Sequence, residues 1–284
     1  MKLGCSSRSY DKSITSGRMD QREWMRRCAR ELELDGVELF DLHFPDTDLP
    51  YLRELKRWAT GLHLTISCVS VSNDFGRPTA EERREELEKV KRWLEIAHFL
   101  GAPVLRVFAG WPPPEPSGGT SGQRQGVRNL LGRLSGLRPR TAKEMLWPEM
   151  VACLRESASC AAEKGIVLAL ENHDSGGFVA TAEEVERCLA QVGSPWLRLC
   201  LDTGNYGDLR SIERTLSQAV HVHAKLYDLD QEGVERRLDW ERIIAILRRG
   251  HYRAFLSIEY EGEEEAETAV PRGVRYLRRL LRGS

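Results

Sequence analysis

The chain alternates short apolar runs with longer amphipathic stretches, and it does so eight times. Apolar runs of this length, set between helical patterns, indicate buried strands. The eight predicted strands are Lys2–Cys5, Gly36–Phe40, Leu64–Val71, Pro103–Ala109, Ile166–Glu171, Leu197–Asp202, Ala219–Lys225 and Ala254–Glu259.

The stretches between these runs carry apolar residues at helical spacing. In Ala80–Leu100 they recur every three or four positions, at Leu87, Val90, Leu94 and Ala97, as on one buried helical face. Comparable patterns predict helices at Glu149–Lys164, Ala182–Val192, Asp239–Arg249 and Ala269–Leu281. Thr181 followed by Glu184 is the pattern of a capping box, and it should begin the helix Ala182–Val192.

Strands that alternate with helices in this way predict parallel strands joined by helical crossovers. A closed (β/α)8 barrel typically needs ~250 residues, and the chain has 284. Eight units in this length favour the closed barrel over the alternative, an open doubly wound sheet. We therefore predict an α/β protein, a single TIM-barrel domain spanning residues 1–284.

One segment interrupts the pattern. Residues Trp111–Met145 follow the fourth predicted strand, contain the stretch WPPPEPSGG, and carry six basic residues from Arg124 to Lys143. In a barrel this insertion would rise from the C-terminal face, where active sites lie. Two interpretations stay open: a tolerated surface loop, or a lid or partner surface.

Charge and composition argue against several classes of partner. The formal net charge is −1 and the pI about 6.7, without the basic excess typical of nucleic-acid binding. No apolar run approaches the ~20 residues of a membrane helix, and the N-terminus lacks a signal-peptide pattern. The seven cysteines form no CxxC pair. We expect a soluble, cytoplasmic protein with reduced cysteines and no nucleic-acid or membrane partner; a homo-oligomer is left open.

Polar residues cluster on the last four predicted strands. Strand five ends in Glu171 and strand six in Asp202, strand seven carries His221, His223 and Lys225, and strand eight ends in Glu259. Side chains two residues apart share a face of a strand. Each of these faces can be the barrel interior, which would gather the carboxylates and imidazoles around one axis at one end.

So many like charges cannot lie unpaired in a water-poor cavity, and a divalent cation resolves the conflict. Taken singly, each residue has a structural explanation, such as a capping aspartate or a hydrogen-bonded histidine. Together they predict one divalent metal ion, because three carboxylates with one imidazole suit Mn²⁺, Mg²⁺, Co²⁺ or Zn²⁺. We expect Mn²⁺ first.

Other residues are candidates for substrate contact. Glu38 and Arg106 lie near strand ends and could face the cavity, although a buried ion pair would also explain them. Trp111 and Phe75 could cover the apolar face of a sugar or belong to the core.

The ordered motifs of the chain resemble a known family. They are GVELF, SVSNDF, LGAPVLRVFAG, LALENHDSGGFVATAEEV, SPWLRLCLDTGNYG, VHVHAKLYD and YRAFLSIEYEG, running from the second predicted strand to the eighth. This set is similar to the xylose isomerase-like barrels, specifically the sugar phosphate isomerase/epimerase group that includes ketose 3-epimerases.

The resemblance implies roles for individual residues. The metal ligands would be Glu171, Asp202, His223 and Glu259, and the acid/base pair would be Glu171 and Glu259. The expected substrate-binding residues are Glu38, Arg106, His173, Asn205, His221 and Lys225. Asn205 stands where the epimerase branch has a histidine three residues after the strand-six aspartate, so a contact with a substrate hydroxyl should differ.

The expected activity is metal-dependent isomerisation or epimerisation of a small sugar or sugar derivative. A proton next to a carbonyl would be removed through a metal-stabilised enediolate. An alternative that shares this first step is a lyase acting on an oxidised (keto) glycoside. A nuclease of the endonuclease IV type is disfavoured, because its three-metal cluster needs more histidines than this chain offers among its seven. A non-catalytic barrel subunit is the third alternative, which the intact ligand set disfavours.

Overall fold

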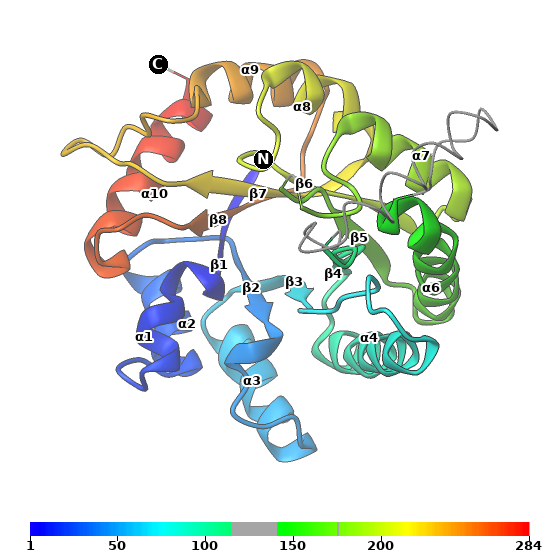
Figure 1. Cartoon of the computed structure of the whole chain (residues 1–284). Coiled ribbons are helices and arrows are strands. Elements are labelled where there is room, and N and C mark those ends of the chain that lie inside the picture. The colour runs from blue at the N-terminus through cyan, green and yellow to red at the C-terminus, as the bar shows by residue number, and fades with distance from the viewer. Residues whose placement is uncertain (115–140, 175, 284) are drawn as a thin grey trace, which may run out of the picture.

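The structure is a computed structural model that describes residues 1–114, 141–174 and 176–283. Eight parallel strands close into a barrel in chain order, and β1 pairs with β8 to complete the ring (Figure 1). The strands are β1 Lys2–Ser6, β2 Gly36–Phe40, β3 Thr65–Ser70, β4 Val104–Val107, β5 Val167–Glu171, β6 Leu197–Asp202, β7 Ala219–Leu226 and β8 Phe255–Tyr260. The predicted (β/α)8 barrel is confirmed.

The helices lie around the outside of the barrel (Figure 1). In the described residues they are α1 Asp11–Thr15, α2 Gln21–Arg30, α3 Leu49–Gly61, α4 Ala80–Leu100, α6 Ala142–Lys164, α7 Ala182–Val192, α8 Leu209–Thr215, α9 Trp240–Arg249 and α10 Ala266–Arg282. Short 3-10 turns occupy Ser7–Tyr10 after β1, Asp41–His43 after β2 and Leu216–Gln218 before β7.

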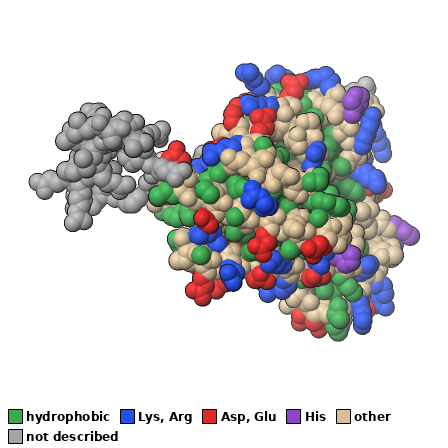
Figure 2. Space-filling view, turned by 90° about the vertical axis from the view of Figure 1, so that its right-hand side faces the viewer, with side chains coloured by type: hydrophobic (Ala, Val, Ile, Leu, Met, Phe, Trp, Pro, Cys, Tyr) green, Lys and Arg blue, Asp and Glu red, His purple; other side chains and the backbone are tan. Residues whose placement is uncertain are grey.

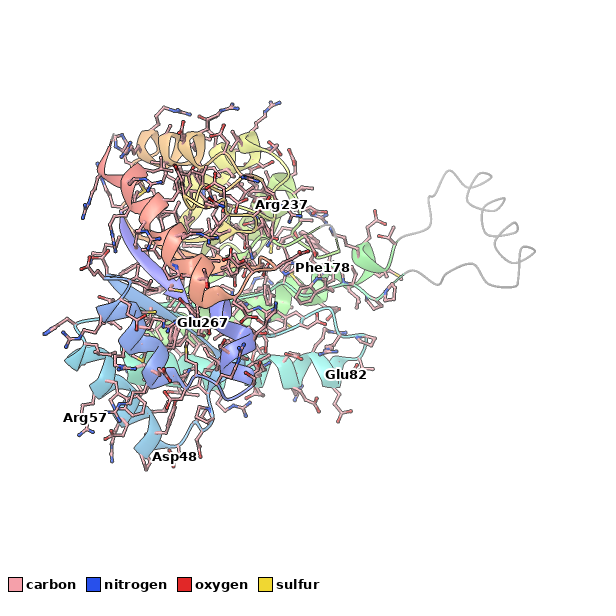
Figure 3. All side chains as sticks on the ribbon, turned by 90° about the vertical axis from the view of Figure 1, so that its left-hand side faces the viewer. Asp48, Arg57, Glu82, Phe178, Arg237 and Glu267 are labelled. Atoms are coloured by element: carbon pink, nitrogen blue, oxygen red, sulfur yellow. The ribbon has the colours of Figure 1, made fainter. Side chains whose placement is uncertain are left out.

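Local sequence signals fix the helix ends. The predicted capping box of α7 is present, because Thr181 accepts from the Glu184 amide and Glu184 accepts in return from the amide of Thr181. Gly193, left-handed at φ 66°, ends the same helix. Asp48 is the N-cap of α3 and accepts a hydrogen bond from the Tyr51 amide, and Glu82 forms the capping box of α4 with Thr79; Figure 3 labels Asp48 and Glu82.

The helix before β5 begins earlier than predicted. It starts at Ala142 rather than at Glu149, because Thr141 and Glu144 form a capping box and Pro148 is accommodated within the helix. The last residues of the predicted Trp111–Met145 insertion therefore belong to α6. Residues 115–140 of that insertion lie outside the described residues.

The core has two parts. The larger one lies between the strands and the surrounding helices and includes Trp24, Leu94 and Leu154. The smaller one fills the inside of the barrel, and its buried members are Cys68, Val104, Ala169 and Cys200. Side chains alternate across each strand, so Glu171 and Asp202, two residues beyond Ala169 and Cys200, also face inward. The smaller apolar cluster therefore lies inside the barrel, below the polar C-terminal ends of the strands.

The surface mixes both signs of charge. On the face shown in Figure 2, Lys and Arg side chains are interspersed with Asp and Glu, in keeping with a formal net charge of −1. Among the helices of the described residues, none is both long enough and apolar enough to cross a membrane.

Candidate active site

The structure brings the four predicted metal ligands together at the C-terminal end of the barrel. One ligating atom from each of Glu171, Asp202, His223 and Glu259 lies within 4.8 Å of the corresponding atoms of the others. Glu171 and Asp202 are the last residues of β5 and β6, and Glu259 is the last but one of β8. All four side chains are buried.

His223 lies in the middle of this quartet. Its Nδ1 is 3.4 Å from Glu171 Oε1, 3.4 Å from Glu259 Oε2 and 3.7 Å from Asp202 Oδ2. Within the described residues, three buried atoms of the quartet make no hydrogen bond: His223 Nδ1, Asp202 Oδ2 and Glu171 Oε2. The two oxygens each lie 3.0 Å from a cationic side chain, Lys225 and Arg106 respectively, whereas His223 Nδ1 faces carboxylate oxygens. Buried polar atoms normally have partners, so this donor set fits a divalent cation of the kind that oxygen and imidazole ligands hold.

A tight turn after β6 aims Asp202. Its Oδ1 accepts hydrogen bonds from the backbone amides of Gly204 and Asn205, at 2.8 and 3.0 Å, which leaves Oδ2 directed at the cluster. A Cβ atom at Gly204 would lie 2.6 Å from Lys225 Cγ, so only glycine fits there.

Asn172 locks the two neighbouring strands at the same level. Its Oδ1 accepts from the Asp202 amide at 2.8 Å, and its Nδ2 donates to the Asp202 carbonyl at 3.0 Å. Its own carbonyl accepts from Asn205 Nδ2. The sequence reasoning missed Asn172, because alternation after Glu171 turns its side chain away from the barrel axis.

Lys225 supplies a buried positive charge beside the carboxylates. Its Nζ lies 2.6 Å from Glu259 Oε2, 3.0 Å from Asp202 Oδ2 and 3.2 Å from Glu261 Oε1. Burial alone would raise the pKa of Asp202 and of Glu259, but Lys225 holds both pKa values below their usual range. Both carboxyl groups are therefore ionised at neutral pH.

The negative groups around His223 favour the protonated form of its imidazole. Burial by itself lowers the pKa of His223, whereas its interactions with Cys200, Glu38, Glu171 and Glu259 raise that pKa well above the usual range. A proton and a metal ion compete for the same nitrogen, so the negative field that favours the proton also favours a bound cation.

Arg106 combines the two interpretations offered for it. Its Nε lies 3.0 Å from Glu171 Oε2, and Nη1 donates to the Val71 carbonyl at 3.0 Å. The guanidinium also lies over the Phe108 ring, 4.1 Å from its centroid. Arg106 is thus a buried ion-pair partner that at the same time lines the cavity described next.

A cavity of about 440 Å³ opens above the quartet. Of the predicted substrate-binding residues, Arg106, His173, Asn205 and Lys225 line it, together with the carboxylates Glu171 and Glu259. The remaining lining residues are Arg8, Phe40, Leu42, Phe108, Trp111, Asp174 and Glu261. The cavity therefore combines a charged floor with aromatic and aliphatic side chains.

The aromatic wall surrounds His173. The His173 ring packs edge-on against Trp111 and Phe108, with centroids 4.7 and 5.0 Å apart. Of the two aromatic residues considered for a sugar face, Trp111 lines the cavity, whereas Phe75 is fully buried in the core.

Glu38 and His221 lie outside the cavity lining. Both were expected to contact substrate, but they are buried at 0% and 1% exposure, and neither lines the cavity. Glu38 Oε1 is 2.9 Å from His223 Nε2, and Oε2 is 2.9 Å from His221 Nε2. Both residues face the barrel interior as predicted, but one level below the quartet, where His223 covers them.

Most cavity residues that the sequence reasoning missed lie in or beside loops. Arg8 is in the turn after β1, Leu42 in the turn after β2, and Asp174 follows β5. No periodic pattern marks loop residues. The only available signal was their position after a strand end, since loops at the C-terminal face of such barrels form the site.

Comparison with known proteins adds a family and a fold. The chain matches the family model of the xylose isomerase-like TIM barrel over residues 27–280. It is 37% identical over 78 residues to the C-glycoside deglycosidase alpha subunit of Arthrobacter globiformis, a match spanning 28% of this chain and only 22% of that protein. It is 24% identical over 233 residues to the inosose dehydratase of Glaesserella parasuis, covering 70% and 72% of the two chains.

Among solved structures, the 3-keto-D-glucoside 4-epimerase of E. coli superimposes with a TM-score of 0.71. The identity is 19%, and the superposition covers 98% of this chain and 99% of that one. At this identity the likeness shows a shared fold.

Proposed function

The chain belongs to the xylose isomerase-like TIM-barrel family, and on that premise we propose that it is a divalent-metal-dependent isomerase or epimerase of a small sugar or sugar derivative. The proposed ligands are Glu171, Asp202, His223 and Glu259, with Mn²⁺ as the first choice of ion. The proposed acid/base pair is Glu171 and Glu259.

The buried quartet carries this proposal. Three carboxylates and one imidazole converge within 4.8 Å, and the cavity begins directly at Glu171 and Glu259. Among the described residues, the buried His223 Nδ1 at the centre of the quartet has no hydrogen-bond partner. A purely structural cluster would be expected to satisfy its own buried polar atoms. The solved epimerase with the same fold supports the reaction class.

The chain's own groups divide the work. When bound, the ion would polarise a substrate carbonyl and offset the charge that develops on its oxygen. One glutamate, in its carboxylate form, removes the proton from the carbon next to that carbonyl, and the other, having taken up a proton from solvent, donates it to carbon. Return to the opposite face of the same carbon is epimerisation, and return to the neighbouring carbon is isomerisation. Arg106 lies 3.0 Å from Glu171 and Lys225 lies 2.6 Å from Glu259, and these ion pairs hold the two carboxyl groups in place.

A second candidate shares the first proton transfer. A lyase would expel a leaving group from the carbon beyond the one that loses its proton, on an oxidised (keto) glycoside. Two relatives favour this reading by name, one a C-glycoside deglycosidase subunit and the other a dehydratase. The two candidates differ in product: elimination gives an unsaturated sugar and a released group, whereas epimerisation leaves the composition unchanged.

Solvent deuterium tests the proposed reaction. The protein loaded with Mn²⁺ would be incubated in deuterated water with free ketoses, aldoses and 3-keto-glucosides, and the sugars examined by NMR. We expect deuterium at one carbon next to the carbonyl, because the carboxyl group that donates to carbon carries a proton exchanged with solvent. Exchange accompanied by release of the aglycone would favour the lyase, and metal-loaded protein that exchanges no sugar would contradict both candidates.

Removing the metal should lower the thermal stability. A ligand that binds only the folded state at about 100 times its Kd stabilises that state by about 2.7 kcal/mol. For a chain of this size, that corresponds to a fall of about 5–10 °C in Tm on chelation. We expect this fall in a thermal unfolding scan with EDTA, and its reversal when the chelator is removed and excess Mn²⁺ is added.

The control for this shift is His223→Ala, which removes the central ligand. The variant should unfold at the same temperature with and without the chelator. A chelator effect of equal size in the variant would place the bound ion elsewhere in the protein.

A further inference from the structure

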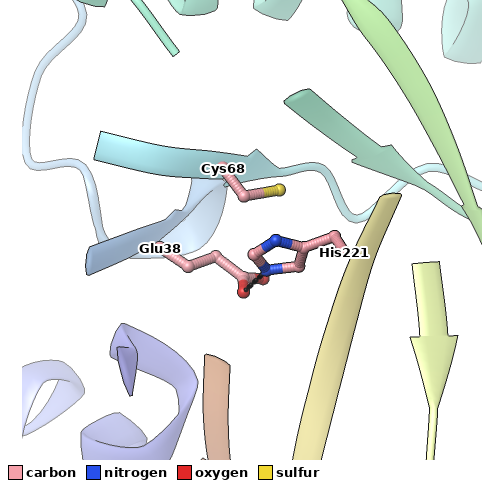
Figure 4. A group of neighbouring side chains, drawn as sticks. All are labelled: Glu38, Cys68 and His221. Atoms are coloured by element: carbon pink, nitrogen blue, oxygen red, sulfur yellow. Dashed lines mark hydrogen bonds and ion pairs between the residues drawn. The ribbon is translucent and has the colours of Figure 1, made fainter. Parts of the chain in front are cut away.

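A three-way contact lies directly beneath the proposed metal site. Glu38 on β2 extends between two histidines of β7, with His221 Nε2 at 2.9 Å from one carboxyl oxygen and His223 Nε2 at 2.9 Å from the other. The hydroxyl of Ser70 on β3 also donates to Glu38. Figure 4 shows the Glu38 carboxyl group pointing at the His221 ring, with the Cys68 side chain above it.

The hydrogen-bonding chemistry of this contact fixes the orientation of His223. A carboxylate accepts hydrogen bonds and donates none, so each imidazole must carry its proton on Nε2. In a neutral ring the lone pair is then on Nδ1. For His223, Nδ1 is the atom that lies 3.4 Å from Glu171 and from Glu259 and makes no hydrogen bond.

We propose that Glu38 is a positioning residue for the metal: it holds His223 with Nε2 protonated and Nδ1 presented to the ion, while His221 and Ser70 hold Glu38. The inference rests on the proposed metal-dependent function, since it assigns a role toward that ion. It reassigns two residues that the sequence suggested as substrate contacts. Outer partners that orient a ligating imidazole are a general feature of metal sites.

A second metal ion in the lower group is the competing explanation. Glu38, Cys68 and His221 have suitable residue types, and their atoms also lie within 4.8 Å of one another. Both Glu38 oxygens, however, already have partners, and the Cys68 thiol donates to the Val69 carbonyl at 3.3 Å. In the described part of the chain none of the three lines the cavity, and none is among the residues with an unpartnered buried nitrogen or oxygen atom.

Metal affinity without turnover is the first test. In Glu38→Gln the side chain keeps its shape but offers one acceptor and one NH₂ donor, so one imidazole Nε2–H loses its acceptor. We expect the Kd for Zn²⁺, measured by competition with a chromophoric chelator, to rise about 10–100-fold, as for other outer partners of metal ligands. The matched control is Glu235→Gln, a buried glutamate whose carboxylate accepts from three backbone amides of the β7–α9 loop, and its Kd should be unchanged.

The second test needs no variant and separates positioning from general structural support. In the zinc-loaded wild type with ¹⁵N-labelled histidine, long-range ¹H–¹⁵N spectra should show protons on Nε2 of both His221 and His223. They should also show a metal-bound Nδ1 on His223 alone.

Three results would overturn the proposal while leaving the proposed function standing. They are zinc on Nε2 of His223, an unchanged Kd in Glu38→Gln, or two zinc ions per chain of which one is lost in Cys68→Ser. Wild-type protein that binds no zinc would instead contradict the metal-dependent function itself, and this inference with it.

Discussion

Replacing Glu259 with Gln should reduce turnover by about 10²–10⁴-fold, the usual contribution of general acid–base catalysis, while metal binding is largely retained. The amide keeps the shape of the side chain and one oxygen able to ligate, but it no longer accepts a proton. Glu259 Oε2 lies 3.4 Å from His223 Nδ1 and 2.6 Å from Lys225 Nζ, at the floor of the cavity. Exchange of solvent deuterium into the sugar measures the loss of proton transfer, and the metal content of the same sample measures how much metal binding is retained.

Glu261→Gln is the matched control for this variant. Glu261 lies two residues further along, contacts the same Lys225 ammonium at 3.2 Å, and lines the same cavity. Its side chain is 40% exposed, however, and it is not part of the quartet. The control should lose little activity. If Glu261→Gln rather than Glu259→Gln abolished exchange, Glu261 would be the proton carrier and the assignment of Glu259 would be wrong.

The fold could be predicted because the eightfold alternation left few alternatives. The predicted bounds of β2 and β6 equal the observed ones, and the other strands differ by one or a few residues at their ends. The convergence of Glu171, Asp202 and Glu259 followed from the same reasoning, since polar residues at the ends of neighbouring parallel strands of a barrel must meet.

The level of a side chain within the barrel could not be predicted in the same way. Alternation shows whether a residue faces inward, but not how deep it lies. His221 precedes His223 by two positions on β7, which places it about 7 Å lower along the strand. Glu38 is the middle residue of β2. Its depth depends on how β2 pairs with its neighbours, and a shift in the register of Glu38 against Cys68 interrupts that pairing.

Contacts that loop residues make, or that side chains make with the backbone, could not be predicted from the sequence pattern either. Arg8 reaches the cavity from a 3-10 turn, and such turns have no hydrophobic period. Asn172 faces away from the barrel axis and yet controls Asp202 through two backbone hydrogen bonds. The early start of α6 did leave a signal, because Thr141 is followed three residues later by Glu144 in the pattern of a capping box.

His223→Ala should have the largest effect on metal affinity. Loss of an outer partner typically weakens binding about 10–100-fold, and removal of a ligand at the centre of the quartet should exceed that, with a Kd raised by more than about 100-fold. His221→Ala is the natural comparison, because it removes the same chemical group two residues away on the same face of β7.

The His221 ring contacts Glu38 and packs edge-on against the His223 ring, but His221 is not one of the four residues of the quartet. Without it, the bond between Glu38 and His223 Nε2 is retained, so the Kd should stay within about tenfold of the wild-type value, at or below the effect of an outer partner. Equilibrium dialysis with Mn²⁺ gives both constants, and a thermal scan in EDTA shows whether the two variants fold equally well without metal. Equal losses of affinity in two equally folded variants would mean that His221 is itself a ligand, either to this ion or to a second one held with Glu38 and Cys68. A larger loss in His221→Ala would place the ion at the lower level of the barrel, and the assignment of His223 as the ligand would then be wrong.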